Sequence, residues 1–250
     1  MIQPVILCGP SGGTLLHEIV EPIVVCGEAQ SSLVLEQLLR AGAPPKAVLL
    51  ESRGRGSAAA LTLAAVHAVT ADDPVLLVLP SNHSIARDDA FRAAVEHAAV
   101  LARRGALVAL GVPPSAPLTG YGYLRARAEY IESFVAQPDA ATAKACFDSG
   151  QCLWSTGIFA LRASAWIEAI ANLCPEVFKA CERAYRHGKR DGAFLRTDAA
   201  AFAACPVQSI DCAVMERIAG DSSSLEAMVV RLDAAWPGYQ SYLTLAITAA

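Results

Sequence analysis

The chain has 250 residues, 54% of them hydrophobic and 18% charged, so it can bury a large core beneath a lightly charged surface. Its formal net charge of −4 at pH 7 gives no electrostatic reason to expect a nucleic acid or a membrane surface as a partner. Gly, Pro or charged residues break every apolar stretch before it could span a bilayer, and Met1–Pro4 has no basic leader region. We therefore expect a cytoplasmic protein without a signal peptide.

In the first half of the chain, short apolar runs alternate with helical patterns. Such a run predicts a strand that is buried on both faces. Strand–helix alternation in turn predicts an α/β fold with a mostly parallel central sheet and helices on both faces. The expected strands are Pro4–Cys8, Ile23–Cys26, Ala47–Glu51, Val75–Leu79 and Leu107–Gly111, and the expected helices are Ser31–Ala41, Ser57–Val69 and Asp88–Arg104.

The second half has longer excursions between its elements. We find no internal repeat, no low-complexity linker and no shift in composition, so we expect a single domain over residues 1–250. The expected strands are Gly120–Tyr123, Tyr130–Val135, Trp154–Arg162 and Ala227–Leu232, and the expected helices are Ala140–Ser149, Ser164–Leu173, Glu176–His187, Ile210–Ile218 and a last one near Tyr239–Ala250.

Cysteine spacing argues against a metal site. None of the eight cysteines forms a C-x-x-C pair, and no second pair or nearby histidine completes a zinc-binding pattern. Cys8 and Cys26 lie inside apolar runs, as small buried thiols do. Ligands of open α/β sheets bind outside the carboxyl ends of the strands, so a binding site is expected near residues 9–13, 51–57 and 80–83 and in the loop beyond Gly111.

Seven runs in a consistent order cover nearly the whole chain: Pro22–Cys26, Leu50–Ala60, Leu77–His83, Thr119–Tyr123, Phe134–Pro138, Trp154–Phe159 and Ser209–Glu216. Together they resemble the bacterial mannose-1-phosphate guanylyltransferases, which make GDP-mannose and diphosphate from GTP and mannose 1-phosphate. The resemblance implies the Rossmann-like nucleotide-diphospho-sugar transferase fold, with a nucleotide-side half over about residues 1–115 and a sugar-side half over about 116–250. We also expect no C-terminal isomerase domain, which some relatives carry.

The same resemblance implies two groups of binding residues. On the nucleotide side they are Cys8, Gly9, Ser11, Gly12, Gly13, Glu51, Gly54, Arg55, Ser81 and Asn82. On the sugar side they are Gly120, Tyr121, Gly122, Ser155, Thr156, Gly157, Asp211 and Glu216. Plainer interpretations remain open: a simple glycine turn at 9–13, a solvated basic turn at 53–55, buried strand tyrosines and surface carboxylates.

The charges that the family uses for catalysis are missing. The connection from Gly9 to Glu21 has thirteen residues, about the dozen that a parallel crossover needs, so the family's Arg–Lys segment has no room. Asn82 and Gly238 stand at the two aspartates that hold Mg²⁺ in active relatives, and a neutral amide is a poor substitute there. Ala136 and Gln137 replace a Glu–Lys pair that grips the sugar phosphate, and Ser155 replaces a sugar-contacting Asn.

Each such loss lowers the rate of nucleotidyl transfer by orders of magnitude. One preorganised charge-stabilising donor is worth about 10²–10³ in rate, and a phosphoryl-transfer arginine about 10³–10⁵. We therefore expect no catalytic residues, no cofactor and no turnover, but a pseudoenzyme that binds GTP or GDP-mannose, as a homo-oligomer or beside an active paralogue. The alternatives are an active nucleotidyltransferase with a remodelled site and a structural interaction domain.

Overall fold

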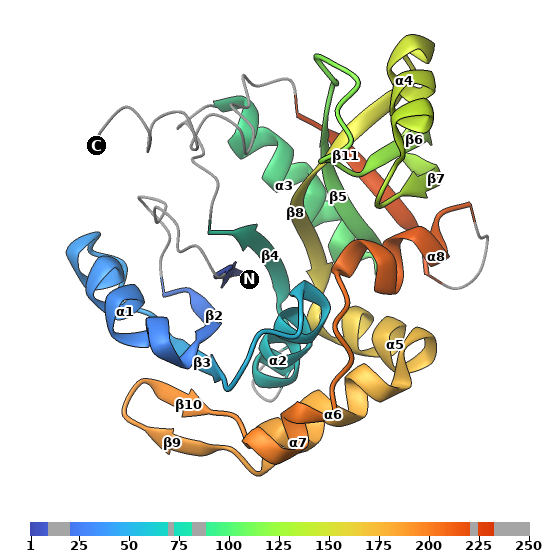
Figure 1. The fold of residues 1–250 in the computed structure, drawn as a ribbon. Coiled ribbons are helices and arrows are strands. Elements are labelled where there is room, and N and C mark those ends of the chain that lie inside the picture. The colour runs from blue at the N-terminus through green and yellow to red at the C-terminus, as the bar shows by residue number, and fades with distance from the viewer. Residues whose placement is uncertain (10–20, 70–72, 82–88, 221–224, 233–250) are drawn as a thin grey trace, which may run out of the picture.

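A computed structural model describes residues 1–9, 21–69, 73–81, 89–220 and 225–232 (Figure 1). The described residues form one continuous sheet of eleven strands with helices packed on both of its faces. The strands are β1 Ile2–Leu7, β2 Ile23–Gly27, β3 Ala47–Glu51, β4 Val75–Pro80, β5 Leu107–Val112, β6 Tyr123–Arg127, β7 Tyr130–Val135, β8 Cys152–Arg162, β9 Lys189–Asp191, β10 Phe194–Arg196 and β11 Ala227–Arg231.

The parallel part of the sheet places several strand ends on one edge. Strands β4, β1, β2 and β3 lie side by side and all run in the same direction, and β10 continues this arrangement beyond β3. β9 then pairs antiparallel with β10 at the border of the sheet. The carboxyl ends of β1 to β4 consequently meet at a single edge.

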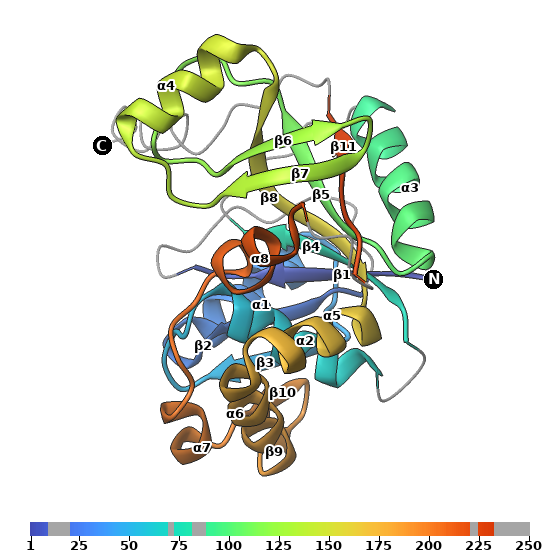
Figure 2. The same ribbon diagram turned by 90° about the vertical axis from the view of Figure 1, so that its right-hand side faces the viewer.

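Strand β8 joins this parallel part to a second, antiparallel part. Its C-terminal half pairs with β4 and its N-terminal end with β6, whereas β5 pairs with both halves across a register shift. At the bend, Gly157 has a φ of +74°, which favours glycine over residues with a side chain. β6 pairs with β7, β7 meets β11, and β11 pairs with β5, which returns to β8, so five strands close a ring. Figure 2 shows the β6–β7 hairpin and α4 together at one end of the molecule, with α6, α7 and the β9–β10 pair at the other.

Each face of the sheet has its own helices. On one face, α2 lies between the sheet and the helices α5 and α6, which explains why it is apolar almost all round. On the other face, α1 covers β1 to β3, and α3 covers β4, β5 and β8. The helices are α1 Ser31–Arg40, α2 Ser57–Val69, α3 Asp89–Arg103, α4 Ala140–Ser149, α5 Ala163–Leu173, α6 Pro175–Arg186, α7 Ala199–Ala203 and α8 Glu216–Ile218, with a 3₁₀ turn at Glu28–Gln30 and a π-helix at Asp211–Met215. None of the helices in the described residues has the length and hydrophobicity that a membrane crossing requires.

Side chains of successive strand residues alternate between these two cores. Val5, Val25 and Leu49 face the helices α2 and α6, whereas Val24 and Val48 face α1. Because both faces are covered, the strands read as unbroken apolar runs. The predicted α/β fold with helices on both faces is confirmed.

Most predicted elements occur within two residues of their expected bounds, and Ala47–Glu51 and Ser57–Val69 match fully. The strand expected at Gly120–Tyr123 is wrong, because residues 119–121 form a turn and the strand runs from Tyr123 to Arg127. Glycines on both sides of Tyr121 favour that turn. The helix expected from Ile210 begins as a π-helix, and β9, β10 and α7 were not predicted. The expected C-terminal helix near Tyr239–Ala250 lies outside the described residues.

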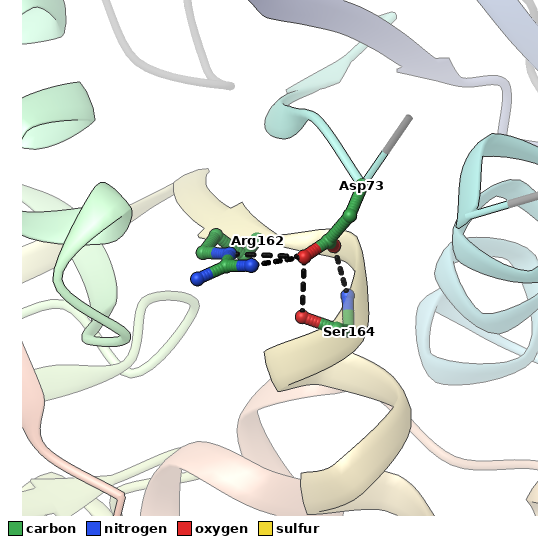
Figure 3. A network of polar contacts seen from close by, with 3 residues as sticks. All are labelled: Asp73, Arg162 and Ser164. Atoms are coloured by element: carbon green, nitrogen blue, oxygen red, sulfur yellow. Dashed lines mark hydrogen bonds and ion pairs between the residues drawn. The ribbon is translucent and has the colours of Figure 1, made fainter. Parts of the chain in front are cut away.

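A polar network fastens the end of the sheet opposite the parallel carboxyl ends (Figure 3). The Asp73 carboxylate accepts hydrogen bonds from Arg162 Nε at 3.0 Å and from Ser164 N and Oγ at 2.8 Å each, and it also pairs with Arg162 Nη2. Asp73 precedes β4, Arg162 ends β8 and Ser164 lies in the first turn of α5. Burial opposes ionisation of Asp73, but the bonds from Ser164 and Arg162 outweigh it and lower the pKa of this carboxyl.

We predict that Asp73→Asn lowers the free energy of unfolding at pH 7 by about 1–3 kcal/mol, because an amide cannot satisfy the same donors. A lowered folded-state pKa stabilises the protein above the unfolded pKa near 3.8, and this stability is lost as pH falls. The difference between wild type and variant in urea titrations should therefore shrink below pH 4. Asp148→Asn, which affects only the exposed Lys144–Asp148 pair, is the matched control and should change little. An equal loss in both variants would contradict the assignment.

Candidate functional site

The carboxyl ends of β1 and β4 lie together at the edge of the parallel sheet. Cys8 N donates to Val25 O at 2.9 Å, and Ser81 N donates to Leu7 O at 3.1 Å, so both residues extend the strands by one position. Ser81 is 5% exposed, and its Oγ is buried without a hydrogen-bond partner among the described residues. Burial raises the pKa of the Cys8 thiol to about 11, which makes it a poor nucleophile. The two predicted contacts Cys8 and Ser81 are thus adjacent.

Glu51 ends β3 on the same edge, and it is the most unusual polar residue there. Its side chain is buried, with a residue exposure of 7%, and Oε1 has no hydrogen-bond partner within the described part of the chain. Burial raises the pKa of Glu51 from 4.5 to about 7. A buried carboxyl without partners costs free energy unless a proton or a ligand donor satisfies it. Glu51 is therefore placed to accept a hydrogen bond from a ligand N–H or O–H group.

The loop between β3 and α2 holds the predicted anion-binding residues. Gly54 is exposed, and no neighbouring atom lies within 4 Å of where a Cβ would stand, so the backbone here is open to a ligand. Arg55 turns in another direction, because its Nη2 donates to Ala203 O at 2.5 Å, next to α7. Its Nε is buried and has no partner in the described structure. Part of the Arg55 guanidinium is therefore already hydrogen-bonded within the protein.

On the sugar side, an aromatic cluster surrounds the predicted glycine turn. Tyr121 stacks on Trp154 with ring centroids 4.6 Å apart, and Tyr123 approaches the same indole edge-on at 6.3 Å. Gly122 O accepts from Ser155 N at 2.8 Å, and a Cβ on Gly122 would lie 3.2 Å from the Phe134 ring. These contacts explain why this turn contains glycine. The predicted positions Gly120, Tyr121, Gly122 and Ser155 are brought together here.

Trp154 itself was not among the predicted site residues. It is 6% exposed, and its Nε1 donor is buried without a partner among the described residues. Tryptophan N–H groups usually find an acceptor when buried. The sequence carried a weak signal, because Trp154 directly precedes the Ser155-Thr156-Gly157 run.

The bend of β8 connects the two sides of the candidate site. Thr156 Oγ1 donates to Leu110 O at 2.8 Å, so this hydroxyl holds β8 against β5. Ser155 Oγ accepts from Gly157 N at 3.4 Å. A Cβ on Gly157 would lie 3.7 Å from Pro80, the last residue of β4. The sugar-side strand therefore touches the end of a nucleotide-side strand.

Two acidic residues frame the π-helix at the same end of the fold. Asp211 begins this helix, and its Oδ1 is buried without a partner in the described residues. Burial, and then the charge of Glu216, raise the pKa of Asp211 to about 6. Glu216 accepts from Ala136 N, its Oε1 lying 3.4 Å from that nitrogen. Short π-helical turns often occur at functional sites, which supports the prediction for Asp211.

Several predicted residues lie outside the described residues, namely Ser11, Gly12, Gly13, Asn82 and Gly238. Gly9 itself is described, and its carbonyl accepts from Gln30 Nε2 at 3.2 Å. Within the ranges that the structure describes, no three His, Cys, Asp or Glu side chains gather as a metal site would require. Neither Glu51 nor Asp211 therefore belongs to such a group among the described residues.

Comparison with known proteins shows the class. The family of nucleotidyl transferases matches residues 10–236, so the chain belongs to the nucleotidyl transferase family. The fold agrees with solved structures. A chain described as mannose-6-phosphate isomerase from Helicobacter pylori aligns with a TM-score of 0.82 at 25% identity, covering 95% of this chain and 99% of that one. UDP-glucose pyrophosphorylase aligns with a TM-score of 0.52 at 10% identity, covering 100% of each, and supports the fold alone.

Relatives with higher sequence identity include mannose-1-phosphate guanylyltransferases, the group that the sequence motifs resemble. The xanthan biosynthesis protein XanB of Xanthomonas campestris pv. campestris is 44% identical over 229 residues, covering 90% of this chain and 48% of XanB. The mannose-1-phosphate guanylyltransferase of Escherichia coli is 39% identical over 242 residues, covering 91% and 49%. The chain spans about half the length of these relatives. The nucleotidyl transferase family and the predicted fold are confirmed, and similarity to mannose-1-phosphate guanylyltransferases extends over about 90% of the chain. Membership of that narrower group, loss of activity, the site residues and the single-domain division stay predictions.

We predict that Glu51→Gln removes a pH dependence of stability. Because the folded pKa of about 7 exceeds the unfolded value of 4.5, the folded protein binds more protons, and its stability falls as pH rises between these values. The total effect is on the order of 3 kcal/mol. Urea titrations from pH 4.5 to 8 should show a shallower decline in Glu51→Gln than in wild type.

Exposed Glu36, whose side chain pairs with Arg40, supplies the control for this measurement. Glu36→Gln should follow the wild-type pH curve. Asp211 titrates in an overlapping range in all three proteins, so only the difference between curves reports on Glu51. Parallel curves for Glu51→Gln and wild type would show that Glu51 ionises freely.

Proposed function

We propose that this chain binds a guanosine nucleotide or GDP-mannose across the edge where β1, β3 and β4 end, with the sugar beside Trp154 and Asp211. The observation that carries the proposal is a pair of buried carboxylate oxygens that have no hydrogen-bond partner among the described residues, Glu51 Oε1 on the proposed nucleotide side and Asp211 Oδ1 on the proposed sugar side. Relatives named for mannose-1-phosphate guanylyltransferase activity suggest the ligand class. Such a binder would serve as a sensor of nucleotide-sugar supply or as a partner of an active paralogue.

The chemistry of these groups fits a polyhydroxylated ligand. Ionised carboxylates only accept hydrogen bonds, whereas sugar hydroxyls and base N–H groups donate them. Burying such an acceptor without a partner costs about 1–3 kcal/mol, which a ligand that supplies the donor recovers. The unpartnered Trp154 Nε1 donor complements them, because it can reach a hydroxyl or phosphate oxygen.

Turnover is a separate matter, because nucleotidyl transfer depends on neutralising phosphate charge. By the motif resemblance, the neutral residues Asn82, Gln137 and Gly238 stand where the family is expected to carry ionised groups. An amide and a glycine do not form the donor set that Mg²⁺ selects at phosphate sites, so these positions do not fit the metal. With several such groups missing at once, we propose that the chain binds its ligand and transfers nucleotide at no more than background rate.

A second candidate is an active nucleotidyltransferase with a remodelled site. The similarity to XanB, 44% over 229 residues and 90% of this chain, favours it. Its countercharges would then come from residues outside the predicted positions. The two candidates share the ligand and differ only in turnover. A structural domain without any ligand is the remaining outcome of the experiments below.

Diphosphate release separates the two candidates. We predict that the protein with GTP, mannose 1-phosphate and Mg²⁺ releases diphosphate at least about 10³-fold more slowly than the Escherichia coli relative assayed in parallel, since the phosphates lack their countercharges. The GDP-mannose formed should be quantified by chromatography, to exclude hydrolysis of GTP by a contaminant. Turnover within tenfold of the relative would establish the remodelled transferase instead.

Ligand binding is tested by thermal shift and calorimetry. At a GDP-mannose concentration about 100 times Kd, binding contributes about 2.7 kcal/mol and raises Tm by roughly 5–10 °C. Asp211→Asn should weaken GDP-mannose about 10- to 100-fold, because a ligand hydroxyl loses its ionic acceptor, and leave GTP affinity nearly unchanged. Asp148→Asn on α4 serves as the control and should bind both as wild type does. No shift with GTP, GDP-mannose or mannose 1-phosphate would favour the structural domain.

A further inference from the structure

The segment Pro206–Ile210 links α7 to the π-helix, and it lies against the loop that precedes α2. It is the orange stretch that rises from α7 toward α8 in Figure 1. Its backbone exchanges two hydrogen bonds with that loop: Gln208 N donates to Arg55 O, and Ala58 N donates to Gln208 O, both at 3.2 Å. A third bond joins Ile210 N to Ser57 Oγ at 2.9 Å. These contacts bridge about 150 residues of sequence, so they are tertiary in origin.

Gly56 makes this close approach possible. Its φ is +84°, a conformation that residues with a side chain rarely adopt. A Cβ at this position would lie 2.2 Å from Gln208 O and 2.8 Å from Gln208 C, both backbone atoms that cannot turn aside. Any side chain would therefore force the 206–210 segment away from the loop. The glycine is required by packing against Gln208 as well as by backbone geometry.

The same segment holds the start of the π-helix. Ser209 accepts from Cys212 N through Oγ at 3.1 Å and from Ala213 N through its carbonyl at 2.9 Å. The Cys174 thiol contacts both Gln208 Oε1 at 3.4 Å and Ala213 O at 3.6 Å. Asp211 lies between these anchored residues. Its position therefore follows that of the 206–210 segment.

We propose that Gly56 and Ser57 are positioning residues, which act through the 206–210 segment to hold Asp211 and the π-helix at a defined place. The loop Arg53–Ser57 on the nucleotide side and the acidic residues on the sugar side then shift as one unit. A nucleotide that orders the loop thereby also orders the sugar-side carboxylates. This last consequence rests on the proposed function, whereas the mechanical coupling itself does not.

Hydrogen–deuterium exchange of the ligand-free protein tests the coupling. In Ser57→Ala, the amides of residues 210–215 should exchange about fivefold faster, the weight of one hydrogen bond, while α3 keeps its wild-type rate. Gly56→Ala should have a larger effect on the same amides. If Gly56→Ala does not fold, Ser57→Ala decides alone, since it removes one oxygen and adds no bulk.

Matched controls exclude a general loss of stability. Ser149→Ala also deletes a hydroxyl that accepts a backbone N–H, that of Gln151, but on α4. Gly42→Ala imposes similar strain, because Gly42 has a φ of +70°, yet a Cβ there meets no atom within 4 Å. Both controls should leave exchange at 210–215 unchanged. Unchanged exchange at 210–215 in Ser57→Ala, or equal acceleration in α3, would overturn the proposal.

Ligand titration adds a second measurement, the ratio of the affinities for mannose 1-phosphate and GTP, which a purely structural role of Ser57 would leave unchanged. Ser57 lies on the nucleotide side, yet Ser57→Ala should weaken mannose 1-phosphate about fivefold and GTP less than twofold. The reverse order would overturn the proposed coupling. If the wild-type protein binds neither GTP nor mannose 1-phosphate, the proposed function fails by itself, and the exchange experiment still decides whether the 206–210 segment is a mechanical link.

Discussion

The parallel pairing of β1 to β4 is the constraint on which the rest of the structure depends. Helices cover both faces of these strands, so almost every residue within them must be apolar. Apart from Gln3 near the start of β1, the polar side chains of these strands lie where the strands stop, and all four strands stop at the same edge. Glu51 and Ser81 stand there with buried oxygens that lack partners among the described residues. Concentrating unsatisfied polar groups at one edge is what makes that edge a candidate binding site.

The buried strands and helices could be predicted from the sequence, because burial on both faces requires an unbroken local run of apolar residues. Ala47–Glu51 is a run of apolar residues closed by one acid, and Ser57–Val69 is apolar around its full circumference, so both could be predicted to the residue. The three-residue strands Lys189–Asp191 and Phe194–Arg196 have no such signature, since charged side chains fill exposed positions and the pairing with β3 is set by tertiary contact. The antiparallel ring could not be deduced from local patterns either.

The sequence motifs could name candidate site residues, but they could not predict the contacts and burial of those residues. The motifs named Asp211 and Arg55, yet nothing in the sequence indicates that Asp211 opens a π-helix or that Arg55 donates to the Ala203 carbonyl. For Trp154 the sequence carried only its place before the Ser155–Gly157 run, because its distinguishing property is an N–H donor without a partner in the described structure. Such properties arise when segments distant in sequence pack together. The close contact of Gly56 with Gln208 belongs to the same class.

Family membership and the charges of individual site residues give different information about function. The match to the nucleotidyl transferase family establishes the fold, whereas the neutral residues at 82, 137 and 238 bear on the proposed loss of turnover. Hydrogen-bond acceptors such as Glu51 can hold a neutral sugar or base without any metal. Moving a phosphate group requires countercharge in addition. A protein can therefore retain the first property and lose the second.

Calorimetric titration of GTP in the presence of either Mg²⁺ or EDTA tests this account most directly. If the proposed site lacks metal-binding carboxylates at the phosphates, the Kd for GTP should agree within about threefold between the two conditions. Tightening of GTP binding by about tenfold or more with Mg²⁺ would contradict the account. It would mean that acidic side chains converge on a metal–nucleotide complex.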